Sequence, residues 1–238
     1  MDLYRAFTFL LSGPLLLSGF CDAPLARAGV DVDTAWSGPA RARGDRVAAV
    51  LALTETEYDT DGGGEVELDR RSLGVGYRTG FSPDLDVLLQ GAYSMKSEVD
   101  DSNFDGNGWQ LGGGLTGRLL QEDEVTVMLF GMLSWLQDRL DAGNADMDVQ
   151  VTRLIIGSTG SFRFRPDLYL TGGLELTPYT DGSSEVSTAG LSSSTDLDPD
   201  DPVVLKLGAR MGLKDYLLRI DLAFSGESSL YLGIGRSI

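Results

Sequence analysis

Hydrophobic and polar residues alternate along most of the sequence. In the segment 203–214, Leu205 and Leu207 share one face with other apolar residues, whereas Lys206 and Arg210 share the opposite face with glycines. A repeat of two sends alternate side chains to opposite sides of a β-sheet. The pattern therefore predicts amphipathic strands with one apolar face and one face that carries charge.

Ten such strands are expected. They cover roughly residues 46–57, 66–81, 85–97, 108–120, 124–138, 147–165, 168–180, 203–214, 216–225 and 229–238. Short turns such as Pro166-Asp167 alternate with long loops such as 98–107 and 181–202, which is typical of outer-membrane barrels. The expected fold is all-β: a closed antiparallel transmembrane β-barrel of about ten strands, with eight as the alternative, short periplasmic turns and longer acidic outer loops.

The segment 66–81 changes the phase of its apolar positions. Leu68 and Leu73 lie an odd number of residues apart, so an unbroken strand would send them to opposite faces of the sheet. One extra residue in a strand shifts this phase. We therefore predict a β-bulge near Arg70 and Arg71.

Aromatic residues gather toward both ends of the expected strands. Those near the short turns are Phe81, Phe164, Tyr169 and Tyr216, and those toward the long loops are Tyr93, Trp109, Trp135, Tyr179 and Phe224. Two bands of this kind mark the two interfaces of a membrane.

Two kinds of barrel would explain the alternation, and they differ in which face of each strand points into the barrel. A membrane barrel turns its apolar face to lipid, whereas a soluble lipocalin-like barrel turns it inward. Glycines share the face of the bases, and glycine weakens an exposed strand but leaves room for long side chains in a narrow lumen. We therefore predict the membrane arrangement. The residues expected to line or constrict the lumen are Arg78, Lys96, Arg118, Arg153, Glu175, Lys206, Arg210, Arg219 and Asp221.

The N-terminal residues have the features of a cleaved signal peptide. Arg5 precedes an apolar stretch, and Ala26-Arg27-Ala28 is a small-x-small cleavage pattern. The stretch is shorter than the roughly 20 residues that a spanning helix needs. Cleavage there would remove Cys21, the single cysteine, so no disulfide is expected in the mature chain. The expected division is a signal peptide at 1–28, a short periplasmic segment at 29–45 and the barrel at 46–238.

The chain is strongly acidic, with a net charge of −17, and the loop 181–202 contains no Lys or Arg. Nucleic acid is not an expected partner, because phosphate binding needs clustered bases. The acidic loop rim is expected to attract divalent cations diffusely. Its candidate oxygen ligands are Asp59, Asp61, Asp196, Asp198 and Asp200. They do not follow the twelve-residue calcium-loop pattern, so neither a defined metal site nor a cofactor is expected.

The sequence contains no histidine. Histidine is the usual proton relay near neutral pH, and a Ser-His-Asp triad cannot form without it. The Gly-Gly-Gly runs at 62–64 and 112–114 are not followed by the Lys-Ser/Thr pair of a phosphate loop. No enzyme activity is expected.

From its alternating strands, short turns and long loops, the chain over about residues 46–238 resembles the small outer-membrane β-barrel superfamily, which OmpA-like and OmpX-like proteins typify. The resemblance implies a monomer in the outer membrane that contacts its lipid and is inserted by the barrel-assembly machinery. One departure is the final residue, Ile238, where such barrels commonly end in an aromatic residue.

Three functions remain open from the sequence. The first is a structural or surface-contact protein with a lumen largely filled by side chains, since small barrels pack their interior. The second is a narrow porin-like channel for small solutes or cations. The third is a soluble periplasmic binder of the lipocalin type.

Overall fold

The computed structural model describes residues 45–61, 63–82, 84–99, 102–188, 191–199, 202–214, 216–224 and 228–237. The predicted signal peptide, nearly all of the segment 29–45, and Asp200 lie outside these residues. Among the described residues, no helix has the length and apolarity to cross a membrane.

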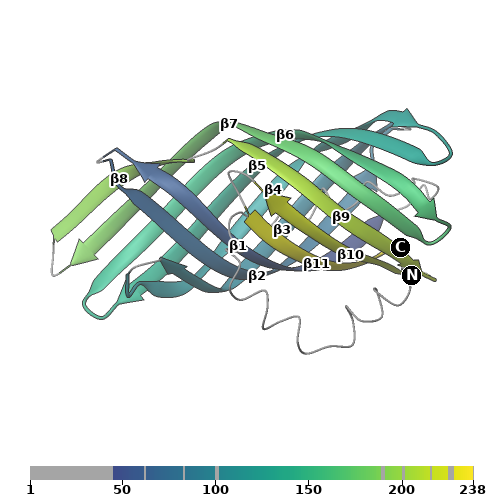
Figure 1. Ribbon diagram of the computed structural model, residues 1–238. Helices are drawn as coiled ribbons and strands as arrows, with labels where there is room; N and C mark the ends of the chain where they lie inside the picture. Colours follow the sequence, from purple (N-terminus) through teal and green to yellow (C-terminus); the bar gives the residue numbers. More distant parts are fainter. Residues whose placement is uncertain are drawn as a thin grey trace.

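Eleven antiparallel strands form one sheet, which closes into a barrel where β11 pairs with β1 (Figure 1). They are β1 (Arg46–Thr60), β2 (Glu65–Gly80), β3 (Leu85–Val99), β4 (Asp105–Gln121), β5 (Val125–Ala142), β6 (Ala145–Arg165), β7 (Leu168–Thr188), β8 (Leu191–Pro199), β9 (Val203–Leu213), β10 (Tyr216–Phe224) and β11 (Ser228–Ser237). The predicted all-β antiparallel barrel is confirmed.

The ten expected strands are present, but several run further into the expected long loops. Strand β7 continues to Thr188, and β8 occupies much of the segment 181–202 that was expected to be a loop. This segment is rich in Ser, Gly and Asp, so it has no apolar alternation to predict a strand. Backbone pairing with neighbouring strands holds it in place instead.

The barrel has two rings of different strand number. Near the short turns, residues 168–176 of β7 pair with β9, and β10 and β11 complete a ring of ten strands. Further out, residues 182–188 of β7 pair with β8, which reaches β1 at Tyr58–Thr60. Strand β8 there takes the place of β9, β10 and β11, so the outer ring has eight strands. The prediction of about ten strands is therefore confirmed for the ring near the short turns, and the eleventh strand, β8, belongs to the outer ring.

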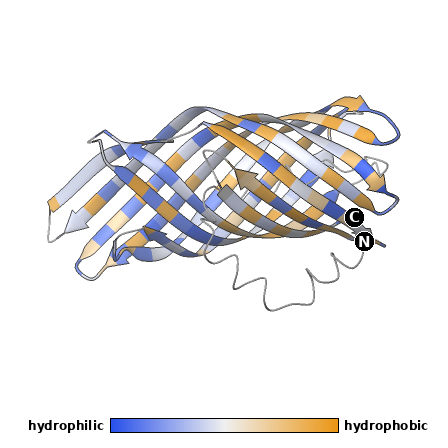
Figure 2. Ribbon diagram, in the orientation of Figure 1, coloured by the Kyte–Doolittle hydropathy of each residue, from blue (hydrophilic) through white to orange (hydrophobic). Residues whose placement is uncertain are grey.

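The exterior of the ten-stranded ring is apolar. Leu205 and Leu207 are 48% and 60% exposed, whereas Lys206 and Arg210 between and beside them are 5% and 2% exposed. Figure 2 shows the resulting alternation of apolar and polar residues along the strands. Leucine-type side chains therefore face outward and charged side chains inward, as a wall in lipid requires. The soluble lipocalin-like alternative needs the opposite faces and is wrong.

Exposed aromatic side chains mark the outer limit of this apolar surface. Trp109 and Trp135 lie on neighbouring strands, and the ring of Trp109 contacts that of Tyr93 at 4.8 Å between centroids. Beyond Trp135, the outward positions of β5 are polar, beginning with Gln137 and Arg139. We call the wall beyond Trp109 and Trp135, formed by β1–β8, the outer extension, and the wall below it the membrane section.

The predicted bulge is present beside Arg71, but it lies in the partner strand. Arg71 is opposite Lys96 and the next residue, Ser72, is opposite Ser94, so the extra residue is Met95 of β3. The alternation of β2 itself is unbroken. Leu68 points inward and Leu73 outward because the interior becomes apolar in the outer extension, not because β2 changes phase.

Candidate functional site

The barrel interior holds most of the charged residues that the sequence analysis assigned to the lumen. Those that are buried are Arg78, Arg153, Glu175, Lys206, Arg210, Arg219 and Asp221. Arg118 is partly buried on the same side of β4 as the buried Thr116 and Gln110. These residues come from six strands and meet only because the sheet closes.

Lys96 is the exception, and its prediction as a lumen residue is wrong. Counted from Ser94, an unbroken strand would turn Lys96 inward. The extra residue Met95 reverses the phase, so that Lys96 lies opposite the exposed Arg71 on the outer wall. There its ammonium group forms an ion pair with Glu98.

Paired charges fill the middle of the membrane section. The Lys206 Nζ lies 2.6 Å from the Glu175 Oε1, and Arg219 forms an ion pair with Asp221. The Thr171 hydroxyl donates to Asp221 at 3.1 Å. The Tyr231 ring, fully buried, lies 5.3 Å from the Lys206 ammonium and so contributes a cation–π contact.

A second group of charges lies nearer the short turns. Arg78 forms an ion pair with Asp86, and its guanidinium also lies 3.9 Å from the Met128 sulfur. At the same end, Asp45 ties the start of β1 to β2. The hydroxyls of Tyr77 and Thr79 donate to its carboxylate at 2.6 and 2.8 Å, and these bonds lower the pKa of Asp45.

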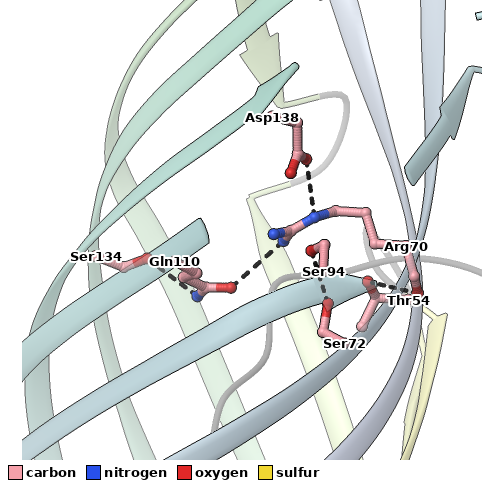
Figure 3. A network of polar contacts seen from close by, with 7 residues as sticks. All are labelled: Thr54, Arg70, Ser72, Ser94, Gln110, Ser134 and Asp138. Carbon is pink, nitrogen blue, oxygen red and sulfur yellow. Dashed lines mark hydrogen bonds and ion pairs between the residues drawn. The ribbon is translucent and has the colours of Figure 1, made fainter. Parts of the chain in front are cut away.

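A polar network lies where the membrane section meets the outer extension (Figure 3). The Arg70 Nε is 2.9 Å from the Asp138 Oδ2, and both side chains are completely buried. The Arg70 guanidinium also donates to Gln110, and the Gln110 amide donates to Ser134 at 3.3 Å. Sequence reasoning missed this network because it placed Arg70 at a bulge and Asp138 at the end of a strand. The signal that indicates this network in the sequence is Asp138. It lies two residues after the apolar Leu136, so both side chains belong to the same face of the strand.

Small residues on neighbouring strands make room for these carboxylates. A Cβ atom added to Gly108 would overlap the carboxylate of Asp138, and one added to Gly208 would overlap that of Asp221. The sequence predicts that the inward glycines leave room for long side chains. At these two positions the side chains they accommodate are acids.

The interior of the outer extension is apolar. Eight side chains, each at most 5% exposed, form one cluster across it: Tyr58, Leu68, Leu136, Leu140, Met147, Val149, Val151 and Leu197. They come from β1, β2, β5, β6 and β8. The missed strand β8 contributes Leu197, so the cluster is complete only when β8 joins the ring.

Carboxylates follow one register line across the outer wall of six strands. Glu55, Asp69, Glu98, Asp105, Asp141 and Asp146 lie opposite one another in turn from β1 to β6. Like charges directly opposite in a sheet repel. A hydrogen bond to Asp146, together with the charges of nearby acids, raises the pKa of Asp141.

The predicted acidic-rim candidates lie on the same outer wall. Asp59, Asp61, Asp196 and Asp198 are exposed, and Asp59 lies opposite Asp198. The three carboxylates whose oxygens lie within 4.8 Å of one another are different residues, Glu55, Glu67 and Asp69.

Small cavities lie between the paired side chains of the membrane section. Two cavities inside its wall, one beside Arg219 and one beside Lys206 and Asp221, have volumes of only ≈ 10 Å³ each. A cavity of this size holds about one water molecule.

No protein-family model and no curated protein matches the sequence. Solved structures are similar in fold. The outer membrane protease OmpT from Escherichia coli matches with a TM-score of 0.57 and 10% identity, over 82% of this chain and 97% of OmpT. The translocator domain of the autotransporter NalP from Neisseria meningitidis matches with a TM-score of 0.51 and 15% identity, over 84% and 90%. The chain thus has the fold of outer-membrane β-barrels, and the resemblance inferred from the sequence is confirmed at that level. One fold carries many functions, so neither activity follows from the likeness.

Proposed function

We propose that the protein is a closed outer-membrane scaffold with a structural or surface-contact role, which it serves by presenting the acidic outer extension. The apolar cluster inside that extension is the observation that carries the proposal. Its eight buried side chains lie across the path that a solute would take beyond the Arg70–Asp138 pair. An apolar constriction sheds water and so blocks ions and polar solutes.

The charged interior supports the same function. The Lys206–Glu175 pair joins opposite charges across the neighbouring strands β9 and β7, whereas Arg219 pairs with Asp221 on the same strand, β10. A buried charge is tolerated when it is paired, and removal of one partner is costly. The Lys206–Glu175 pair therefore acts as a link that holds β9 and β7 in register, and the Thr171–Asp221 hydrogen bond links β7 to β10, in place of side chains that select a passing solute.

We also propose that the protein is not an enzyme. The whole sequence lacks histidine, and the paired interior acids and bases are shut away from solvent. Similarity in fold to a protease leaves this unchanged, because catalysis depends on the arrangement of particular side chains.

Planar-bilayer recordings test the closed scaffold. We expect the purified full-length protein to give no discrete conductance steps, with insertion verified by flotation with vesicles. Steps that change in size when Arg118 or Arg210 is replaced by alanine would contradict the proposal. That result would favour the alternative function, a narrow channel for small solutes or cations lined by these bases.

A further inference from the structure

A pocket of ≈ 250 Å³ opens on the outer wall of β1, β2 and β3, just beyond the apolar surface. We infer that this outer pocket binds the headgroup of a membrane amphiphile that carries both a phosphate and an ammonium group. Its outward charged lining comprises Arg71 and Lys96 together with Asp69 and Glu98, Leu53 lies beside Arg71, and the inward-facing residues Thr54 and Arg70 complete its lining. The inference concerns the exterior, so it holds whether or not the lumen conducts.

The pocket lies at the height of a lipid headgroup. Three successive outward rows cross β1, β2 and β3 in register. The apolar row is Leu51, Leu73 and Tyr93, the next is Leu53, Arg71 and Lys96, and the acidic row is Glu55, Asp69 and Glu98. Outward positions on one strand are about 7 Å apart, so the wall changes from apolar to basic to acidic within about 14 Å. An amphiphile with a phosphate and an amine has matching groups in the same order: its acyl chain faces the apolar row, its phosphate the bases and its amine the acids.

The bulge at Met95 creates this arrangement. It turns Lys96 outward beside Arg71, whereas an unbroken strand would have placed Lys96 in the lumen. Arg71 then lies directly beyond Leu73, which is 52% exposed, and Lys96 lies opposite Arg71 on β3. A base at this position meets the phosphates of lipid whose chains cover the leucines below it.

The two signs of charge in one pocket select the ligand. A simple phosphate would be attracted by Arg71 and Lys96 but repelled by Asp69 and Glu98. A headgroup with an added ammonium satisfies both pairs, because the amine meets the carboxylates beyond the phosphate. Glu55 and Glu67 strengthen the acidic end, since their carboxylate oxygens lie within 4.8 Å of those of Asp69.

Binding of short-chain lipids to the full-length protein in a non-ionic detergent tests the inference. The probes are dihexanoyl phosphatidylethanolamine, dihexanoyl phosphatidylglycerol and inorganic phosphate, with the ³¹P linewidth as the readout. We expect phosphatidylethanolamine to bind about tenfold more tightly than phosphatidylglycerol, because only the former carries the amine. Inorganic phosphate is expected not to displace it at equal concentration.

Three variants locate the site. Arg71→Gln should weaken phosphatidylethanolamine binding about fivefold, because it removes charge-assisted bonds to the phosphate. Asp69→Asn should reduce the preference for phosphatidylethanolamine over phosphatidylglycerol. The matched control is Arg139→Gln, since Arg139 is an exposed base outside the pocket that pairs with Asp148. It should leave binding unchanged, and circular dichroism should confirm that all three variants remain folded.

Three outcomes would overturn the inference. Equal binding of the two lipids would show that the carboxylates do not recognise the amine. Displacement by inorganic phosphate at equal concentration would show a site for a free anion and not for a lipid. An equal loss in Arg71→Gln and Arg139→Gln would show that the general surface charge, and not the outer pocket, attracts the headgroup.

Discussion

The membrane section and the outer extension are built by the same strands with opposite polarity. In the membrane section of β6, Arg153 points inward, whereas Leu154 and Ile156 face outward. In the outer extension, nearer the start of β6, Val149 points inward and Asp148 faces outward. The backbone alternation does not change between the two regions. What changes is the medium outside, from lipid to water.

This contrast shows that the surroundings, and not the strand geometry, decide which side chains are buried. In lipid, the outward face must be apolar, so charged side chains are placed inside and must pair with one another. In water, burial of apolar side chains stabilises the fold, so the leucines turn inward and the acids outward. The Arg70–Asp138 pair lies where the two regimes meet.

The largest effect should follow from a break in that boundary pair. Asp138→Ala would leave the buried Arg70 guanidinium without its counter-charge. We expect a loss of about 3–5 kcal/mol in the free energy of unfolding, measured by urea titration in detergent or lipid vesicles. The double variant Arg70→Met/Asp138→Leu should recover most of the loss, because an apolar pair needs no counter-charge. A loss below about 1 kcal/mol in Asp138→Ala would show that the pair is not buried as described.

A comparison of two leucines on β5 should separate the regions directly. Leu140 is 1% exposed inside the outer extension, whereas Leu133 is 55% exposed on the lipid-facing wall. Leu140→Ala should cost about 2–5 kcal/mol, because it leaves a cavity in a packed core. Leu133→Ala should cost clearly less, since mobile lipid chains can fill the space. Equal losses in the same urea titrations would contradict the assignment of inside and outside.

Acid should affect the two ends of the barrel in opposite directions. Because the folded state raises the pKa of Asp141, its contribution to stability is present at low pH and is lost as the pH rises through the raised pKa. The melting temperature of the outer extension should therefore rise as the pH falls from about 7 toward 4. The folded state lowers the pKa of Asp45, so this residue stabilises the fold at pH values above its unfolded pKa. That stabilisation is lost only when the pH falls further, through the lowered pKa. The control variant Asp141→Asn should flatten the first response; an unchanged response would assign it to other acids.

The smallest effect should come from the ion pair on the outer wall of the extension. The Arg139 Nε lies 3.2 Å from the Asp148 Oδ1, but the Arg139 side chain is 77% exposed. Arg139→Ala should change the free energy of unfolding by about 0.2–1 kcal/mol, and added salt should reduce the difference further. A loss as large as that of Asp138→Ala would mean that burial does not set the strength of these pairs.

The bulge shows a limit on what the sequence of a single strand can predict. An irregularity is present at Arg71 as predicted, but the pattern of Leu68 and Leu73 has another cause, since β2 keeps its alternation and the extra residue lies in β3. A bulge belongs to a pair of strands, and one strand read alone does not show which partner carries the added residue. For the same reason Lys96 was placed in the lumen, and the pocket it helps to form was missed.

Strand β8 shows the opposite case. Its Ser- and Asp-rich sequence has only Leu191 and Leu197 as large apolar residues, so the local pattern predicts a loop. Its place between β7 and β1 comes from backbone hydrogen bonds, which are open to any sequence that can extend. The interior network was missed likewise, because Arg70, Gln110 and Asp138 lie on three strands that are distant in the chain.

The sequence by itself determined the class of fold, the positions of most strands and, for most of their residues, the side that faces lipid. These follow from a repeat of two and from hydrophobicity, which are local properties that every strand carries in its own residues. Only the tertiary structure decided the change from ten strands to eight, the partners of the buried charges and the outward turn of Lys96. Each of these depends on the register between strands, and register is set by the closure of the whole ring.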